Sequence, residues 1–194
     1  MDRDINGILK DAVAGIAGIG GLGSNAAVAL ARMGIGRLVL ADYDIVDESN
    51  LNRQHYMIRH LGMKKVHAIK QIIGEINPQV HIESHDIYVD GCNAPEIFKD
   101  ADIVIEAFDV ASCKAEFVNS ILGNTGKKVI AASGLAGYGP ANSIVTRRVT
   151  ERLYIVGDGV SGLSEGEKLL ASRVAIAANH QANLAVRLLI GEEI

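Results

Sequence analysis

The chain has 194 residues, a formal net charge of −4 and a hydrophobic fraction of 48%. This length fits one domain with a substantial core, and the slightly acidic balance argues against a general nucleic-acid-binding surface. The sequence has no run of about 18 apolar residues that could span a membrane, and its first residues lack a signal-peptide pattern. We therefore expect a single cytoplasmic domain over residues 1–194.

The N-terminal part of the chain alternates between helical and strand patterns. Residues 1–11 are expected to form a short amphipathic helix, and residues 12–17 form an apolar run that is typical of a buried strand. Residues 24–33 are rich in alanine and leucine, which favour a helix. Residues 38–41 are the next expected strand. Together these segments predict a βαβ unit.

A glycine-rich turn, Gly18-Ile19-Gly20-Gly21-Leu22-Gly23, joins the first strand to the helix of this unit. The missing Cβ atoms at Gly18, Gly20 and Gly23 permit a tight turn, a close backbone approach to phosphate and close packing of helix on strand. The N–H groups at the start of the helix would then face the anion. Asp42 ends the second strand, where an acidic residue binds a ribose hydroxyl. The pattern predicts a nucleotide-binding site.

The glycine signature is shared by NAD and FAD enzymes, so the choice of nucleotide depends on the residues that follow Asp42. Residues 42–54 form a long polar stretch that begins with acids and reaches a cation at Arg53, and Lys64 and Lys65 follow. Hydride transfer needs no cations at such positions. Attack on a nucleoside triphosphate does, because negative charge builds on the departing pyrophosphate.

The rest of the chain continues the alternation and then changes. Helices are expected at 61–76, 93–99 and 112–122, and strands at 80–87, 101–107 and 128–132. Two further strands, 142–148 and 152–156, are expected to form an antiparallel extension, followed by a mobile active-site loop at 157–166 and a helix at 169–190. We therefore expect a Rossmann-like, doubly wound α/β fold, with a mainly parallel sheet and a C-terminal antiparallel extension.

The glycine turn, the pattern D-x-D-x-V-x-x-S-N-L-N-R-Q over residues 42–54 and Gly62-Met63-Lys64-Lys65 together resemble the ThiF/MoeB family, which is related to the ubiquitin-activating enzymes. The resemblance covers nearly the whole chain and is strongest to the short, zinc-free ThiF proteins of thiamine biosynthesis. It implies an adenylyltransferase that uses Mg-ATP. The implied substrate is the C-terminal glycine carboxylate of a ThiS-like ubiquitin-like sulfur carrier ending in Gly-Gly, and the implied assembly is a homodimer.

The resemblance also assigns roles to charged residues. Arg53 and Lys65 carry over as phosphate-binding cations, with surface salt bridges as the alternative and Lys64 as the neighbouring choice. Asp109 follows an expected core strand and matches the aspartate that binds the metal bridging the ATP phosphates, so it is the expected Mg²⁺ ligand. The alternative for Asp109 is an N-cap of the following helix.

Other polar residues of the resemblance have less defined roles. Asn50 and Gln54 would hydrogen-bond phosphate, position Arg53 or stabilise the turn. Asp44 would contact nucleotide or order its loop. Arg3 is the candidate for an arginine that some family members receive from a partner's N-terminal region, and Arg173 fits either a structural helix or a carrier cleft.

Cys92 and Cys113 are the only cysteines, too few for a four-thiolate zinc site, so no structural zinc is expected. Both precede Lys127, and neither matches the thioester or persulfide cysteine of some relatives. We therefore expect adenylation here and sulfur transfer on another component. A nicotinamide-dependent oxidoreductase and a non-catalytic nucleotide-binding scaffold are the two rival hypotheses.

Overall fold

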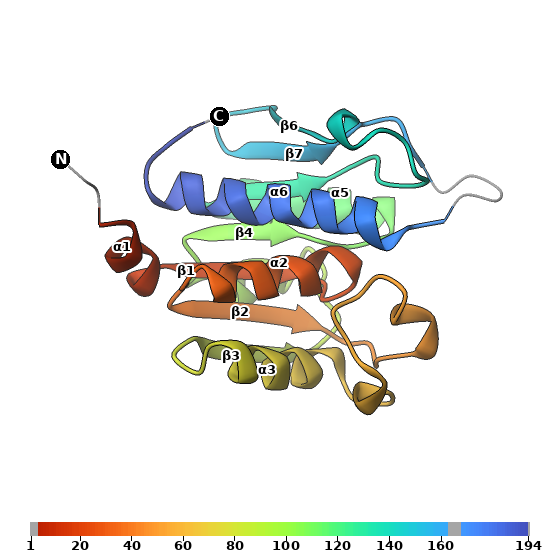
Figure 1. The fold of residues 1–194 in the computed structure, drawn as a ribbon. Coiled ribbons are helices and arrows are strands. Elements are labelled where there is room, and N and C mark those ends of the chain that lie inside the picture. Colours follow the sequence, from red (N-terminus) through yellow and green to blue (C-terminus); the bar gives the residue numbers. More distant parts are fainter. Residues whose placement is uncertain (1–3, 163–167, 194) are drawn as a thin grey trace.

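The structure is a computed structural model, and it describes residues 4–162 and 168–193. Its centre is a sheet of seven strands (Figure 1). The strands are β1 (Val13–Ala17), β2 (Arg37–Asp42), β3 (His81–Asp86), β4 (Ile103–Glu106), β5 (Lys128–Ala132), β6 (Val145–Arg148) and β7 (Leu153–Gly157). Their order is β3-β2-β1-β4-β5-β7-β6. The chain therefore leaves β1 towards β2 and later returns to the other side of β1 at β4, which creates the switch point where such sheets bind ligands.

Helices cover both faces of this sheet. They are α1 (Ile5–Asp11), α2 (Gly21–Arg32), α3 (Lys65–Ile76), α4 (Ala94–Ile97), α5 (Ala111–Asn124) and α6 (Ala171–Leu189), with 3₁₀ turns at Glu48–Asn50, Ile58–His60 and Ala141–Ser143. In Figure 1, α2, α3 and α6 lie side by side over one face. A second cluster, built on Phe98 of the loop after α4 and on Phe117 and Ile121 of α5, fills the other face. Because both faces are covered, the inner strands β1, β2, β4 and β5 are rich in apolar residues.

The expected Rossmann-like fold with a mainly parallel sheet is confirmed. The C-terminal extension is antiparallel only in its outer strand, because β6 pairs antiparallel with β7 while β7 pairs parallel with β5. Tyr154 and Val156 of β7 are buried in the core, and this alternating pattern is compatible with either direction of pairing.

The first residues of α2 and α3 differ by three and four positions from those expected, and local contacts explain both differences. α2 starts at Gly21, inside the glycine turn, so its first N–H groups belong to the turn itself. α3 starts at Lys65 and not at residue 61. Gly62 has a φ of +80° and its N–H donates to Val46 O (2.9 Å), which holds residues 61–63 in a turn before the helix. Within the described ranges, no helix has the length and apolarity needed to cross a bilayer.

The glycine turn packs too closely for side chains at two positions. Gly18 has a φ of +86°, and a Cβ there would lie 2.9 Å from Ala107 O. A Cβ on Gly23 would lie 1.9 Å from Gly18 O, so helix α2 sits directly against the end of β1. Gly23 is therefore required for packing of the turn.

Gly23→Ala is expected to lower the free energy of unfolding by at least about 2 kcal/mol, because backbone must move to admit the methyl group. Gly74→Ala is the matched control, since Gly74 is also helical and a Cβ there meets nothing within 4 Å. That substitution should stabilise the protein by about 0.5–1 kcal/mol. Urea unfolding of both variants measures the difference, and equal stabilities would show that the turn relaxes freely.

Candidate active site

A cavity of about 300 Å³ lies at the carboxyl ends of the central strands. The last residues of β2 and the residues directly after β1 and β4 meet there with the crossover that joins β2 to α3 (residues 43–64). Most of the site residues expected from the sequence line it: Gly18, Gly20, Gly21, Asp42, Asp44, Arg53, Gln54, Lys65 and Asp109. Gly23 and Asn50 do not line it. The cavity thus gathers expected site residues that lie up to 91 positions apart in the chain, from Gly18 to Asp109.

Asp42 connects the glycine turn to the crossover. One carboxylate oxygen accepts a hydrogen bond from Ile19 N (2.5 Å) and the other accepts one from Asp44 N (2.8 Å). Burial raises the pKa of Asp42 above its usual value, and the charge of Lys65 and the two backbone N–H groups partly oppose this rise. The carboxylate is therefore fixed in orientation at the cavity wall, as a ribose ligand needs to be.

Lys64 and Lys65, at the start of α3, have different hydrogen-bond and ion-pair partners. Lys65 has a side chain only 7% exposed, and its Nζ lies 2.7 Å from Asp44 Oδ2 at the cavity. Lys64 is not among the lining residues: its Nζ donates to Tyr43 O (2.9 Å) and pairs with Asp86 Oδ1 (3.1 Å). Of the two lysines considered from the sequence, Lys65 is the one at the cavity.

Arg53 and Gln54 follow Asn50 in the crossover. Arg53 Nη1 donates to Ser49 O (3.0 Å) and Asn52 Oδ1 (2.8 Å), which curls the guanidinium back over its own turn. Gln54 Oε1 is buried and has no hydrogen-bond partner in the described part of the chain. Such an acceptor on a cavity wall is suited to a donor group on a ligand. Asn50 Oδ1 accepts from Asp47 N (3.1 Å), so its side chain stabilises the turn.

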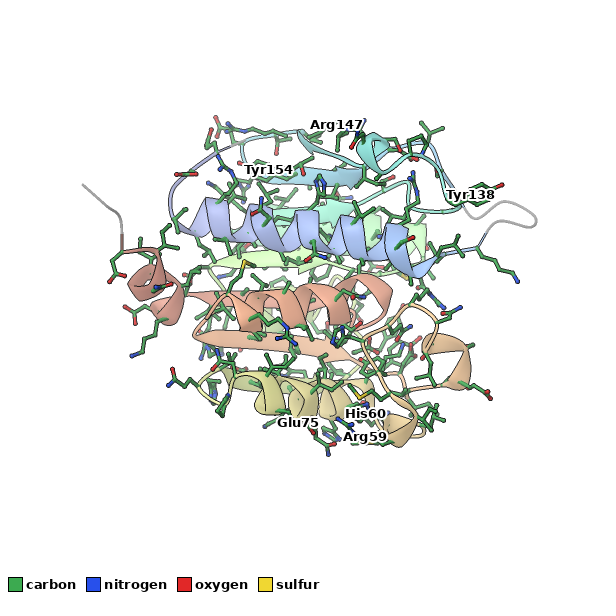
Figure 2. The ribbon with its side chains drawn as sticks, viewed as in Figure 1. Arg59, His60, Glu75, Tyr138, Arg147 and Tyr154 are labelled. Atoms are coloured by element: carbon green, nitrogen blue, oxygen red, sulfur yellow. The ribbon has the colours of Figure 1, made fainter. Side chains whose placement is uncertain are left out.

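The crossover is itself held on α3. Arg59 and Glu75 form an ion pair of 2.9 Å across this junction (Figure 2). Beside them His60 is buried, and its Nδ1 accepts a hydrogen bond from Met57 N (3.0 Å). Tyr56 donates its hydroxyl to Ile19 O (2.8 Å), and burial strongly raises the pKa of that hydroxyl, which keeps it a donor. The Arg59–Glu75 pair thus joins the crossover to α3, and the Tyr56 hydroxyl joins it to the glycine turn.

Asp109 lies in the loop between β4 and α5. The N-cap residue of α5 is Val110, and no side chain caps that helix within the described residues, so capping is not the role of Asp109. Its exposed carboxylate faces the cavity. No group of three or more His, Cys, Asp or Glu side chains in the described ranges is arranged to hold a metal ion. A single carboxylate fits a magnesium ion that takes its other ligands from phosphate and water.

Part of the cavity wall is mostly apolar, and this wall was not predicted from the sequence. Ile87, Tyr88 and Val89 follow β3, while Val110 and Cys113 come from the start of α5. The Tyr88 ring packs edge-on against Tyr43, with centroids 5.1 Å apart, and its hydroxyl lies 3.4 Å from Cys113 Sγ. The one available signal was the position of these residues just after a strand end. An apolar wall with aromatic side chains suits a nucleobase.

A second cavity of about 310 Å³ adjoins the first, because both are lined by Gly21, Phe108, Asp109 and Leu169. Its other walls are largely small residues, such as those of the segment 132–136 after β5. The side chain of Tyr138 projects from the loop that follows and is 90% exposed (Figure 2). The two cavities meet at the Asp109 loop.

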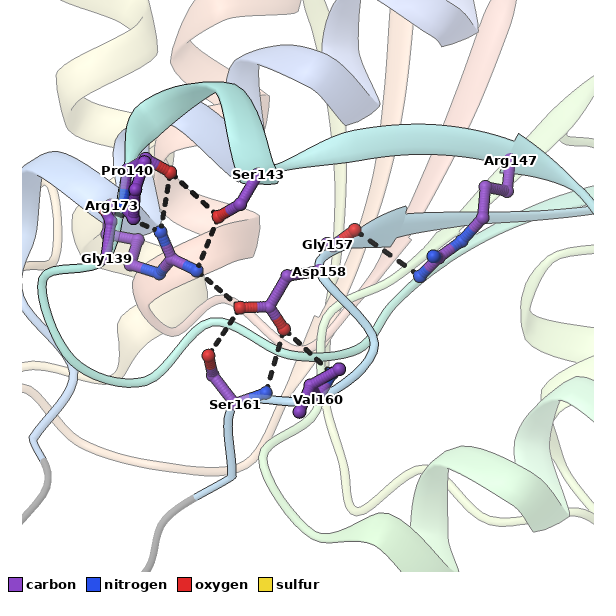
Figure 3. A network of polar contacts seen from close by, with 9 residues as sticks. All are labelled: Gly139, Pro140, Ser143, Arg147, Gly157, Asp158, Val160, Ser161 and Arg173. Atoms are coloured by element: carbon purple, nitrogen blue, oxygen red, sulfur yellow. Dashed lines mark hydrogen bonds and ion pairs between the residues drawn. The ribbon is translucent and has the colours of Figure 1, made fainter.

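Arg173 at the start of α6 ties together the loops beside this second cavity (Figure 3). Its side chain is 3% exposed, and its guanidinium donates to Gly139 O (2.9 Å) and Ser143 Oγ (3.2 Å) and pairs with Asp158 at 2.5 Å. Although burial alone would raise the pKa of Asp158, hydrogen bonds from Ser161 and Val160 and the charge of Arg173 lower it to about 2. The sequence predicted a mobile loop at residues 157–166. Its first part, residues 157–162, contains Asp158, which is anchored by these bonds. Residues 163–166 of the loop and Arg3 lie outside the described residues.

This ion pair predicts a specific loss of stability in acid. The folded pKa of Asp158 is below its value in the unfolded chain, so its stabilising contribution is present above about pH 4. The contribution is lost as the pH falls towards 2. Asp158→Asn should cost about 3 kcal/mol at pH 7 and should flatten the pH dependence of unfolding between pH 4 and 2.

The control is Asp100→Asn, because Asp100 is a surface aspartate paired with Arg37 (3.3 Å) and its side chain is 56% exposed. This control should keep the acid dependence of the wild type. Chemical unfolding at a series of pH values measures the effect. An Asp158→Asn variant with an unchanged slope would mean that Asp158 is not held as an ion.

Comparisons with known proteins agree with this geometry. The ThiF family model matches residues 7–194. Adenylyltransferase and sulfurtransferase UBA4 of Kluyveromyces lactis is 37% identical over 129 residues, which are 66% of this chain and 29% of that protein. tRNA threonylcarbamoyladenosine dehydratase of Bacillus subtilis is 36% identical over 116 residues, 59% of this chain and 46% of that protein. The chain thus spans less than half the length of these two curated relatives.

Among solved structures, E. coli tRNA N6-threonylcarbamoyladenosine dehydratase, TcdA, in complex with AMP has a TM-score of 0.88 and 23% identity to this chain. The match covers 97% of this chain and 90% of that one. At this identity the likeness shows a shared fold.

Proposed function

Because the chain belongs to the ThiF family, we propose that it is an adenylyltransferase that activates the C-terminal glycine carboxylate of a ubiquitin-like carrier protein. The observation that carries the proposal is that Arg53, Lys65 and Asp109, from three separate segments, line one cavity with the glycine turn. An adenylyltransferase among the relatives, UBA4, further supports this chemistry. The proposed catalytic unit is one domain over residues 1–194.

In the proposed reaction the carrier carboxylate attacks the α-phosphorus of ATP. A new oxygen–phosphorus bond forms, the bond from the α-phosphorus to the bridging oxygen breaks, and pyrophosphate leaves with the electron pair. The N–H groups at the start of α2, beginning at Gly20 and Gly21, would bind phosphate oxygens. Arg53 would turn from its present partners to bind phosphate with two parallel hydrogen bonds, and Lys65 would act as a point charge.

Catalysis in this proposal comes from positioning and from stabilisation of the charge on pyrophosphate. Asp42 would hold the ribose, and Asp44 would keep Lys65 beside the phosphates. A bound magnesium ion would neutralise charge on the phosphates, with Asp109 as the ligand supplied by this chain. No cysteine of this chain takes part.

The second cavity would receive the carrier tail. It opens beside Asp109 and is lined by small residues that include Gly134 and Gly162, so a chain without side chains could pass along it. A tail ending in Gly-Gly meets this requirement. We further propose a ThiS-like sulfur carrier and thiazole synthesis for thiamine, sulfur transfer on another component, and a cytoplasmic homodimer.

A second candidate substrate is a modified tRNA nucleoside. It is favoured by the 36% identity, over 116 residues, to the Bacillus subtilis tRNA threonylcarbamoyladenosine dehydratase. A threonylcarbamoyl group also carries a carboxylate, so the same activation by ATP would apply. Pyrophosphate exchange stimulated by tRNA bearing this nucleoside, and not by a Gly-Gly carrier, would select this candidate.

Mg-ATP should protect the protein from thermal unfolding while NAD⁺ and NADH should not. At a concentration about 100 times Kd, the expected rise in Tm is about 5–10 °C. Lys65→Ala should reduce the shift, while Lys64→Ala, whose side chain lies outside the cavity lining, should keep it. Protection by NADH alone would favour the oxidoreductase hypothesis.

Carrier-dependent exchange of labelled pyrophosphate into ATP tests the reaction directly. The wild type should catalyse exchange with a ThiS-like carrier, and Asp109→Ala should lower the rate by about 100-fold or more. Far-UV circular dichroism should remain that of the wild type, because the Asp109 side chain is exposed. ATP binding without any exchange, tested with both carrier and tRNA, would favour a non-catalytic scaffold.

A further inference from the structure

A carboxylate is buried in the middle of the sheet, directly behind the Asp109 loop. Glu106 ends β4 and is 0% exposed, although its neighbours in the strand are apolar. Its Oε1 accepts hydrogen bonds from Phe108 N (2.7 Å) and Lys114 Nζ (2.8 Å). Burial raises the pKa of Glu106, and the Lys114 charge and hydrogen bond, followed by the backbone N–H groups of Phe108 and Ala132, oppose that rise.

Lys114 lines the second cavity but has no N–H left for a substrate. Its ammonium group has three donors. They are directed to Glu106 Oε1 (2.8 Å), Glu106 Oε2 (3.1 Å) and Ala132 O (3.2 Å). The side chain is 23% exposed, and its charge is neutralised inside the protein. Lys114 is therefore arranged to hold protein groups together.

These bonds close the loop that carries Asp109. Glu106 stands before the loop and Lys114 stands in the first turns of α5 after it, so their ion pair joins the two ends. The Phe108 N–H, adjacent to Asp109 in the chain, is bound to the same carboxylate. On the other side Gln181 of α6 donates to Glu106 O (3.0 Å), which fixes the strand end.

We propose that the Glu106–Lys114 ion pair is a positioning device that sets Asp109 for the metal-bound nucleotide. This inference rests on the proposed function. A buried ion pair contributes little net stability, because an apolar pair of similar volume packs as well or better. What an apolar pair lacks is an acceptor for the Phe108 N–H and a link from β4 to α5. The pair is thus suited to orienting the loop.

The test compares ATP affinity with and without magnesium by isothermal titration calorimetry on the full chain. Lys114→Met should raise the Kd for ATP in excess Mg²⁺ by about 10-fold and leave the Kd for ATP in EDTA unchanged. Lys114→Arg, which keeps the charge, should restore most of the magnesium effect. Lys127→Met is the matched control, since Lys127 binds Lys99 O and Ala101 O (both 2.6 Å) away from both cavities.

The outcomes separate the positioning role from a structural one. Equal losses of affinity with and without magnesium would indicate general damage and overturn the proposal, as would a Lys114→Met variant identical to the wild type. If Lys114→Met does not fold, the double variant Glu106→Leu with Lys114→Met removes both charges, and it should show the same selective loss of the magnesium effect. A wild type that binds ATP under neither condition would overturn the proposed function itself.

Discussion

The site depends on the carboxylate of Asp42 and on the two hydrogen bonds that this carboxylate accepts from backbone N–H groups. Asp42 ends β2 in parallel register with β1, so its side chain reaches the Ile19 N–H of the glycine turn. The other oxygen binds Asp44 N, and Asp44 in turn binds Lys65. A chain of contacts therefore runs from the glycine turn through two acids to the cation at the start of α3.

On the other side of the switch point, around Asp109 and the second cavity, the loops are held by two ion pairs. Glu106 and Lys114 hold the Asp109 loop, and Arg173 and Asp158 hold the loops beside the second cavity. Each ion pair joins two segments that lie apart in the chain: Glu106 of β4 pairs with Lys114 of α5, and Asp158 after β7 pairs with Arg173 of α6. The sheet thus places these loops at the strand ends, and the ion pairs fix the orientation of the loops.

The sequence was informative where the physics is local. Apolar periodicity located the strands, and the glycine turn together with Asp42 located the cavity. The sequence was less informative about features that depend on a contact between residues far apart in the chain. The start of α3 depends on Gly62 binding Val46 O, and the direction of β7 depends on its pairing with β5. Neither contact is visible in a hydrophobic pattern.

The buried ion pairs were missed for the same reason. Glu106 was the one charge inside the apolar run 103–107, and this was a usable signal of a partner. Its identity as Lys114 required the geometry of the β4–α5 loop. For Arg173, the sequence left a structural role and a carrier cleft open, and Asp158 became its partner only through the placement of β7 beside α6.

The outermost strands of the sheet limit how the protein meets other molecules. β3 carries His81, Glu83 and His85, and β6 carries Arg147 and Arg148. Charged side chains on an edge strand discourage a further strand from pairing with it. Association by sheet extension is therefore disfavoured at both borders, and this leaves the helical layers and the loops at the strand ends as the routes of assembly.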